Sequence, residues 1–137
     1  YKSLNAMKSK LLIPQIVPKG FTHCYYTFAA KFEGEKYGIS WKSFREKYVS
    51  FGGDGIYAAW KNVNDETIFK NIKNKGLVSG SMKLTSSYGY GLTPVAKKLQ
   101  RKIMQFTTNQ KNKAEIKKQI NALEKTIIFF EKNNKIN

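Results

Sequence analysis

The feature that most restricts the fold is a run rich in aromatic residues between Phe21 and Phe32. Along this run two sets of side chains alternate with a period of two residues, which is typical of a strand that buries one face. The sequence therefore predicts a strand over residues 21–32. The side chains expected on its buried face are Cys24, Tyr26, Phe28, Ala30 and Phe32.

Helix and strand signals follow this run in turn. Ser40 is a good N-cap for a helix with apolar residues at helical spacing, and Gly52 and Gly53 are expected to end that helix. The stretch DGIYAAW after these glycines is short and apolar, which indicates a second strand. The expected elements are a turn over residues 33–36, a helix over 41–49, a strand over 54–60, a short helix over 68–72 and a mobile loop over 73–92.

The C-terminal part predicts two further helices. Pro94 at a first helical position loses no needed hydrogen bond, so a helix is expected over residues 94–106. Its apolar side would carry Val95, Leu99, Ile103 and Phe106, and its basic side Lys97, Lys98, Arg101 and Lys102. Asn112 and Glu115 are spaced as in a reciprocal helix cap. The last helix is expected to bury Ile116, Ile120, Leu123, Ile127 and Phe130.

These elements predict an α+β fold of two layers, in which a small, mainly antiparallel sheet is packed by helices on one face. A chain of 137 residues can bury one core without a metal or a disulfide. The sequence opens on a polar stretch and continues through Pro14 and Pro18, which favour an extended connector. We therefore expect a connector from a preceding domain over residues 1–20, a domain over 21–131 and a tail over 132–137.

Composition leaves one binding function open and excludes several kinds of site. The net charge is +16, from 25 Lys and Arg against 9 Asp and Glu, so a free-standing basic module for nucleic acid or an acidic partner is an alternative. One Cys and one His exclude an internal disulfide and a structural zinc cluster, and no metal site is expected. No apolar run is long enough to span a membrane, and the cysteine usage fits a reducing, cytoplasmic compartment.

The residues themselves give little support for catalysis. His23 is a candidate base or substrate-orienting group, but no acid accompanies it in the sequence, and a lone histidine on a strand is more often structural. The serines within residues 79–87 lack the spacing of a nucleophile elbow. No catalytic residue is therefore assigned in this chain.

Two segments resemble a known enzyme family. The run IPQIVPKGFTHCYYTFAAKFEGEKYGISWKSFREKYVSFGGDGIYAAW, followed by PVAKKLQRKIMQFTTNQ, is similar to the C-terminal part of the DegT/StrS nucleotide-sugar aminotransferases, which are fold-type-I pyridoxal-phosphate enzymes. The pattern of His23 and Tyr25 resembles a His-x-Tyr pattern of that family. The resemblance spans residues 10–130 and implies the fold of the small C-terminal domain of these enzymes.

The resemblance also implies a function for the complete protein. Enzymes of this family transfer an amino group from an amino acid such as glutamate to a keto-sugar nucleotide, in lipopolysaccharide or surface-glycan biosynthesis. The lysine that forms the Schiff base with pyridoxal 5'-phosphate belongs to a large N-terminal domain that this chain lacks. The chain alone is therefore expected to hold no cofactor and to be inactive, whereas the complete protein would be a transaminase that depends on pyridoxal phosphate.

The same resemblance indicates which residues face the sugar. In the family the small domain closes one wall of an active site at a homodimer interface. The implied partners are the nucleotide sugar, the amino-acid donor and a second copy of the protein, and neither a membrane nor a nucleic acid. The substrate-binding positions carried over to this chain are His23, Tyr25, Tyr57, Trp60 and Lys61.

Overall fold

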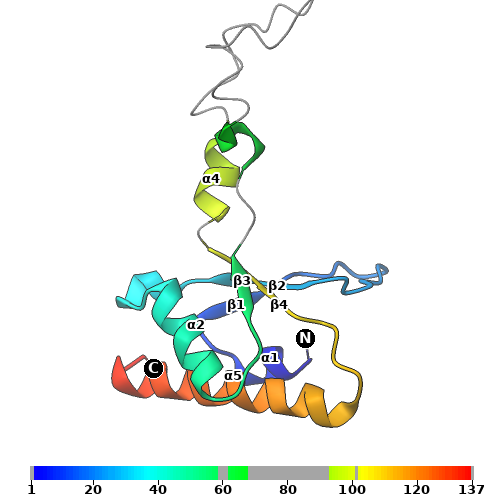
Figure 1. Cartoon of the computed structure of the whole chain (residues 1–137), viewed down its shortest axis with the longest axis vertical. Helices are drawn as coiled ribbons and strands as arrows, with labels where there is room; N and C mark the ends of the chain where they lie inside the picture. Colours follow the sequence, from blue (N-terminus) through cyan, green and yellow to red (C-terminus); the bar gives the residue numbers. More distant parts are fainter. Residues whose placement is uncertain (1, 59–61, 68–92, 101, 137) are drawn as a thin grey trace, which may run out of the picture.

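The described residues form a four-stranded antiparallel sheet (Figure 1). The structure is a computed structural model that describes residues 2–58, 62–67, 93–100 and 102–136. The strands are β1 (Leu12–Pro14), β2 (Phe28–Phe32), β3 (Ile56–Ala58) and β4 (Ile103–Phe106), in the order β1-β2-β4-β3. The last strand in sequence, β4, therefore pairs with both β2 and β3 in the interior of the sheet.

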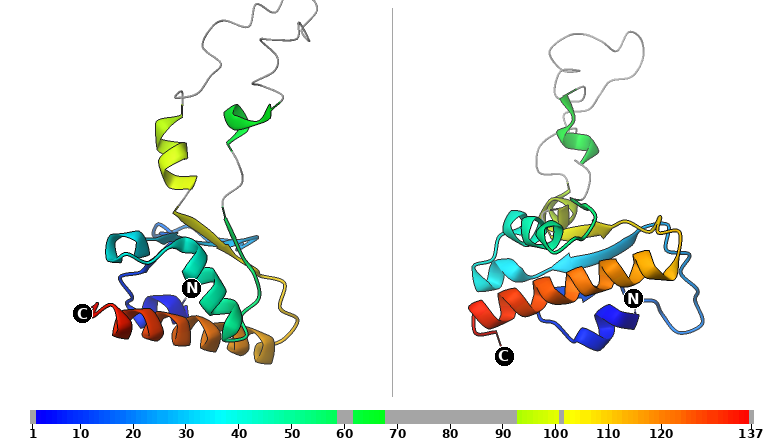
Figure 2. Two further views of the ribbon diagram at one scale, coloured as in Figure 1. Left: turned by 60° about the vertical axis from the view of Figure 1, so that its left-hand side comes forward. Right: turned by 60° about the horizontal axis from the view of Figure 1, so that its bottom comes forward.

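The helices of the described residues are α1 (Lys2–Met7), α2 (Trp41–Ser50), α4 (Pro94–Gln100) and α5 (Lys113–Asn133), with short 3-10 helices η1 (Gly34–Tyr37) and η2 (Val63–Asp65). Of these, α1, α2 and α5 cover one face of the sheet (Figure 2). The long helix α5 runs beneath the sheet with α1 beside it, whereas α4 lies beyond the sheet on the side away from α5 (Figure 2). This arrangement confirms the predicted α+β fold.

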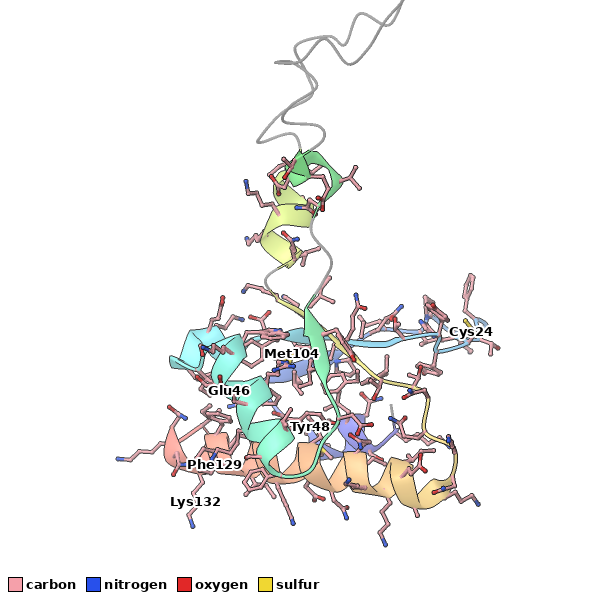
Figure 3. All side chains as sticks on the ribbon, in the orientation of Figure 1. Cys24, Glu46, Tyr48, Met104, Phe129 and Lys132 are labelled. Carbon is pink, nitrogen blue, oxygen red and sulfur yellow. The ribbon has the colours of Figure 1, made fainter. Side chains whose placement is uncertain are left out.

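The sheet has one buried face and one open face. The buried face consists of Leu12, Ala30, Phe32, Ile56, Met104 and Phe106. Because successive side chains of a strand point to opposite faces, the residues between them lie on the open face. There Tyr57, which is 59% exposed, stands opposite Gln105 in the register of β3 and β4. In Figure 3 Met104 lies among the helices and strands, as the burial pattern requires.

An aromatic stack joins the sheet to its two main helices. The ring of Phe44 on α2 lies between Phe32 of β2, at 5.3 Å, and Phe130 of α5, at 5.7 Å. Phe32 and Phe44 are fully buried, so each removes a large apolar surface from water. Tyr48, one turn later on α2, meets Phe106 of β4 edge to face at 5.9 Å. The α2 helix is therefore fixed against both central strands.

Several local predictions are confirmed. Ser40 is the N-cap of α2 and accepts a hydrogen bond from the Ser43 N–H at 3.0 Å. Gly52 follows the helix with a φ of 88°, which favours glycine. The second expected strand forms as β3 in its described part. The short helix expected over 68–72 and the loop expected over 73–92 lie outside the described residues.

The cap of α5 is also confirmed, with a small difference. Asn112 accepts a hydrogen bond from the Glu115 N–H at 3.0 Å. The Glu115 carboxylate accepts in return from the Lys111 N–H at 2.8 Å rather than from the N–H of the cap residue. Of the predicted stripe, Leu123, Ile127 and Phe130 are buried, whereas Ile116 is 45% exposed.

The strand predicted over residues 21–32 is wrong in its first half. Only Phe28–Phe32 forms β2, because Tyr25 has a φ of 50° and a left-handed residue cannot continue a strand. Ahead of it Cys24 is exposed rather than a core thiol, and it lies far from the helices in Figure 3. Tyr26 is 87% exposed and is not a core residue either.

The helix predicted over residues 94–106 is also wrong in its second half. α4 ends at Gln100, and residues 103–106 form β4. Met104 and Phe106 are buried between β2 and β3, so long-range pairing decides the structure of this segment. Val95, expected on the apolar side of a helix, is 69% exposed.

The segment expected to be a connector contributes to the core. Leu4 of α1 is 3% exposed, and Leu11 and Leu12 are buried at the start of β1. Pro14 ends β1 on the edge of the sheet, where a missing N–H leaves no gap in the ladder. Residues 2–14 are therefore packed into the same unit as the rest of the fold.

A buried carboxylate ties the end of β2 to its surroundings. Glu33 is 3% exposed, and its N–H donates to the Leu11 carbonyl at 2.8 Å. Lys31 contacts one carboxylate oxygen, while the ammonium groups of Lys36 and Lys102 lie 3.1 and 3.5 Å from the other. Hydrogen bonds from Lys31 and Lys36 lower the pKa of Glu33 from 4.5 to about 2, against the effect of burial.

The low pKa of Glu33 predicts a specific loss of stability in acid. A carboxyl group whose pKa is lowered by folding stabilises the fold above pH 4.5, and this contribution disappears as the pH falls to about 2. We expect Glu33→Gln to lower the urea midpoint near neutral pH and to approach the parent chain near pH 2. The control is Glu46→Gln. Glu46 is 61% exposed and lies 3.9 Å from Lys42, and an exposed ion pair of this kind contributes little to the free energy of unfolding. An equal pH profile in both variants would contradict this role of Glu33.

Candidate ligand groove

Two hollows lie at the end of the sheet where β2 begins and β4 ends. The larger, which we call the tyrosine groove, has a volume of about 650 Å³ and is lined by Tyr25, Tyr26, Thr27, Tyr57, Gln105, Phe106, Thr107, Thr108 and Asn109. The smaller, the helix pocket, has a volume of about 290 Å³. It lies between the sheet and the helices α1 and α5, with Leu4, Met7, Phe28, Ile120 and Leu123 among its apolar lining.

A common wall separates these two hollows. Tyr25, Phe106, Thr107 and Thr108 line both the tyrosine groove and the helix pocket. Phe106 is buried at the end of β4, and Thr108 donates a hydrogen bond to the Tyr26 carbonyl at 2.8 Å. The segment before β2 is therefore anchored to the segment after β4, and the position of Tyr25 affects both hollows.

The side of the wall nearest α2 is held by a glutamine on α5. Gln119 Oε1 accepts from the Tyr48 hydroxyl at 2.6 Å and from the Asp54 N–H at 2.7 Å. Burial, with a smaller contribution from the Asp54 carboxylate, raises the pKa of Tyr48 to about 12. A β-carbon on Gly53 would overlap the Tyr48 ring, so a glycine is required where the chain passes that ring.

The Asp54 carboxylate continues this network to the end of β4. Its Oδ2 accepts from Gln110 Nε2 at 3.2 Å and from Thr107 Oγ1 at 3.4 Å, and Gln110 also donates to Thr107 at 2.9 Å. The stretch from Gly52 to Gly55 therefore ends α2 and links that helix to α5 and to the end of β4.

The tyrosine groove is suited to binding rather than to bond-making chemistry. Tyr rings offer flat faces, and Gln105, Asn109 and the threonines offer amide and hydroxyl groups. Among the described residues that line it there is no lysine, arginine or acid. The described lining thus offers no amine for a Schiff base and no cation for a phosphate, so these described residues do not fit pyridoxal phosphate.

The structure brings part of the expected site together. Tyr25 precedes β2 and Tyr57 lies on β3. These two strands are separated by β4 in the sheet, yet both tyrosines line the same groove. The His23 ring contacts the Tyr25 ring in a tilted arrangement, with centroids 4.4 Å apart. Trp60 and Lys61 lie outside the described residues.

Sequence reasoning missed the groove residues on β4 and in the segment that follows it. Gln105, Thr107, Thr108 and Asn109 were expected on or after a helix, so no site was assigned to them. The signal was present as the polar run TTNQ directly after an alternating pair of buried residues, Met104 and Phe106. An assignment of strand to residues 103–106 would have placed this run at a sheet end.

The basic helix face expected from the sequence is not formed. Lys97 and Lys98 lie on α4, but Lys102 follows the end of that helix, and its ammonium group approaches Glu33. Arg101 lies outside the described residues. Lys102 therefore does not share a helix side with Lys97 and Lys98.

Comparisons with known proteins identify no relative. No protein-family model, no curated protein and no solved structure matches this chain. Within the described residues, every helix is too short or too polar to traverse a lipid bilayer. Those residues also contain no group of three His, Cys, Asp or Glu side chains placed to hold a metal ion.

The hydrogen bonds of Gln119 predict an order of stabilities. Gln119→Met removes the acceptor of the half-buried Tyr48 hydroxyl and of the exposed Asp54 N–H, which costs about 1–3 kcal/mol, whereas Tyr48→Phe removes one bond and costs about 0.5–1.5 kcal/mol. Urea unfolding of both variants measures this difference. Equal stability of the parent chain and Gln119→Met would contradict the role assigned to this residue.

Proposed function

We propose that this chain is the small C-terminal domain of a nucleotide-sugar aminotransferase that depends on pyridoxal phosphate, and that the tyrosine groove receives the sugar. The observation that carries the proposal is that Tyr25 and Tyr57, which the resemblance assigns to the substrate, line one groove although they are distant in sequence.

The chemistry of the groove supports a sugar ligand. Sugars present both C–H faces and hydroxyl groups, so they are bound by aromatic rings together with amides and hydroxyls. Tyr57 supplies an exposed ring on the open face of the sheet, and Gln105 stands opposite it in the register. Thr108 and Asn109 add polar groups at the rim.

The proposal divides the work between this chain and the rest of the enzyme. The chain supplies one wall of the site and binds the sugar, while a large domain supplies the lysine amine and holds the cofactor. The amino donor would be an amino acid such as glutamate, and a second copy of the protein would complete the active site. The enzyme would work in the cytoplasm, in lipopolysaccharide or surface-glycan biosynthesis.

The test uses the complete reading frame that contains this chain. We expect it to encode a large domain with a Schiff-base lysine, and the purified protein to transfer an amino group from glutamate to a keto-sugar nucleotide. Tyr57→Ala should raise the KM for the nucleotide sugar about 3- to 10-fold through lost ring contact. The control is Phe21→Ala, because Phe21 is 73% exposed and does not line the groove.

Two results would overturn the proposal. One is a reading frame without a large domain, combined with tight binding of DNA that weakens steeply as salt rises, which is the behaviour of a basic binding module. The other is an active transaminase in which Tyr57→Ala and Phe21→Ala have the same KM as the parent protein.

A further inference from the structure

A histidine side chain holds the backbone of the tyrosine that separates the two hollows. The Tyr25 N–H donates to His23 Nδ1 at 2.7 Å. A backbone N–H can only donate, so Nδ1 must carry a free lone pair, and the proton of the neutral ring must lie on Nε2. A protonated imidazole has N–H groups at both nitrogens and cannot accept this hydrogen bond.

Tyr25 needs such support because its backbone is strained. Its φ is 50°, in the left-handed region that is costly for a residue with a β-carbon. Such conformations persist where the surroundings hold them, and they gather at binding sites. The supports described for this segment are the His23 hydrogen bond, the tilted His23 ring with its centroid 4.4 Å from that of Tyr25, and the Thr108 hydrogen bond to the Tyr26 carbonyl.

Because of where Tyr25 lies, this hydrogen bond affects the shape of both hollows as well as the local turn. Its side chain lines both the tyrosine groove and the helix pocket, and its ring lies 6.3 Å from Phe28 at the start of β2. If its backbone left the left-handed region, the ring would move from this wall. The tyrosine groove would then lose one of its aromatic faces.

We propose that His23 is a positioning residue: its neutral imidazole holds Tyr25 in the wall of the tyrosine groove, and protonation of the imidazole releases Tyr25 and weakens binding of the sugar nucleotide. The binding clause rests on the proposed function, whereas the positioning of Tyr25 does not. Histidine is suited to this task because its side chain changes charge between about pH 5 and 8. His23 therefore acts on the backbone of a ligand-binding residue instead of on the ligand.

The hydrogen bond from the Tyr25 N–H is the interaction of His23 through which pH would act on the groove. The titratable groups beside the imidazole in the same segment are the Tyr25 phenol, whose ring centroid lies 4.4 Å from that of His23, and the side chains of Cys24 and Tyr26. Among the ion pairs of the described residues, none includes His23.

Two variants separate this role from a merely structural one. An asparagine side chain readily accepts a hydrogen bond from the N–H two residues later. Because its amide does not titrate, His23→Asn keeps the acceptor at every pH. His23→Leu removes the acceptor at every pH. The parent chain should resemble the first variant at high pH and the second at low pH.

The experiment follows the Tyr25 amide of the 137-residue chain by NMR between about pH 5 and 8, without any ligand. In the parent chain we expect its chemical shift to change together with the His23 ring signals, and its protection from exchange, relative to the intrinsic rate, to fall about fivefold at low pH. His23→Asn should abolish the pH dependence, and His23→Leu should be unprotected throughout. A Tyr25 amide that ignores the His23 titration, or follows pH equally in His23→Asn, would overturn the proposal.

A second measurement separates failure of this inference from failure of the proposed function. In the complete enzyme the KM for the nucleotide sugar should rise about fivefold from pH 8 to pH 6 in the parent and stay constant in His23→Asn. Absence of amino transfer would remove the proposed function, while the amide measurement still decides whether His23 positions Tyr25. An active enzyme whose KM has the same pH dependence in both proteins would overturn the binding clause.

Discussion

The stack of Phe44 between Phe32 and Phe130 is the contact on which the rest of the fold depends. It joins β2, one of the two central strands, to α2 and α5 in one apolar cluster. A sheet of short strands is only marginally stable alone, so it needs a covering layer that is fixed against it. With one face covered in this way, the alternation of side chains leaves Tyr57 and Gln105 on the open face. The binding surface is thus a direct consequence of where the core lies.

The sequence predicts the parts of this structure that depend on local chemistry. Ser40 and Asn112 cap their helices because a side-chain oxygen can satisfy an N–H three residues away, a relation that sequence spacing displays. The α+β class follows from the order of elements in the same way. For residues 94–106 local information fails, because Val95, Leu99, Ile103 and Phe106 also fit a helical spacing. Only pairing with β2 and β3, which are distant in sequence, selects a strand for the last four residues.

The candidate site was predictable only in part for a related reason. The alternation of residues 21–32 continues without a visible break through Tyr25, yet the chain turns there. The cause is a side-chain acceptor, His23 Nδ1, which competes with the strand ladder for a backbone N–H. Tyr25 and Tyr57 were identified by resemblance, whereas Thr107 and Thr108 become part of a site only once β4 places them beside both tyrosines. A groove built where two strands end depends on register, and register is a property of the folded sheet.

The charge of the chain and the lining of the groove act at different ranges. A net charge of +16 attracts anions over a distance of several ångströms, and it does so for a nucleotide as for any other phosphate. Near Glu33 three lysines are already engaged by one buried acid, so part of this charge serves the fold. The described lining of the tyrosine groove is neutral, and discrimination there must come from ring faces and hydrogen bonds. The basic composition can therefore raise the rate at which an anionic ligand arrives, while under the proposed function the ring faces and hydrogen-bonding groups of the groove would decide which ligand is retained.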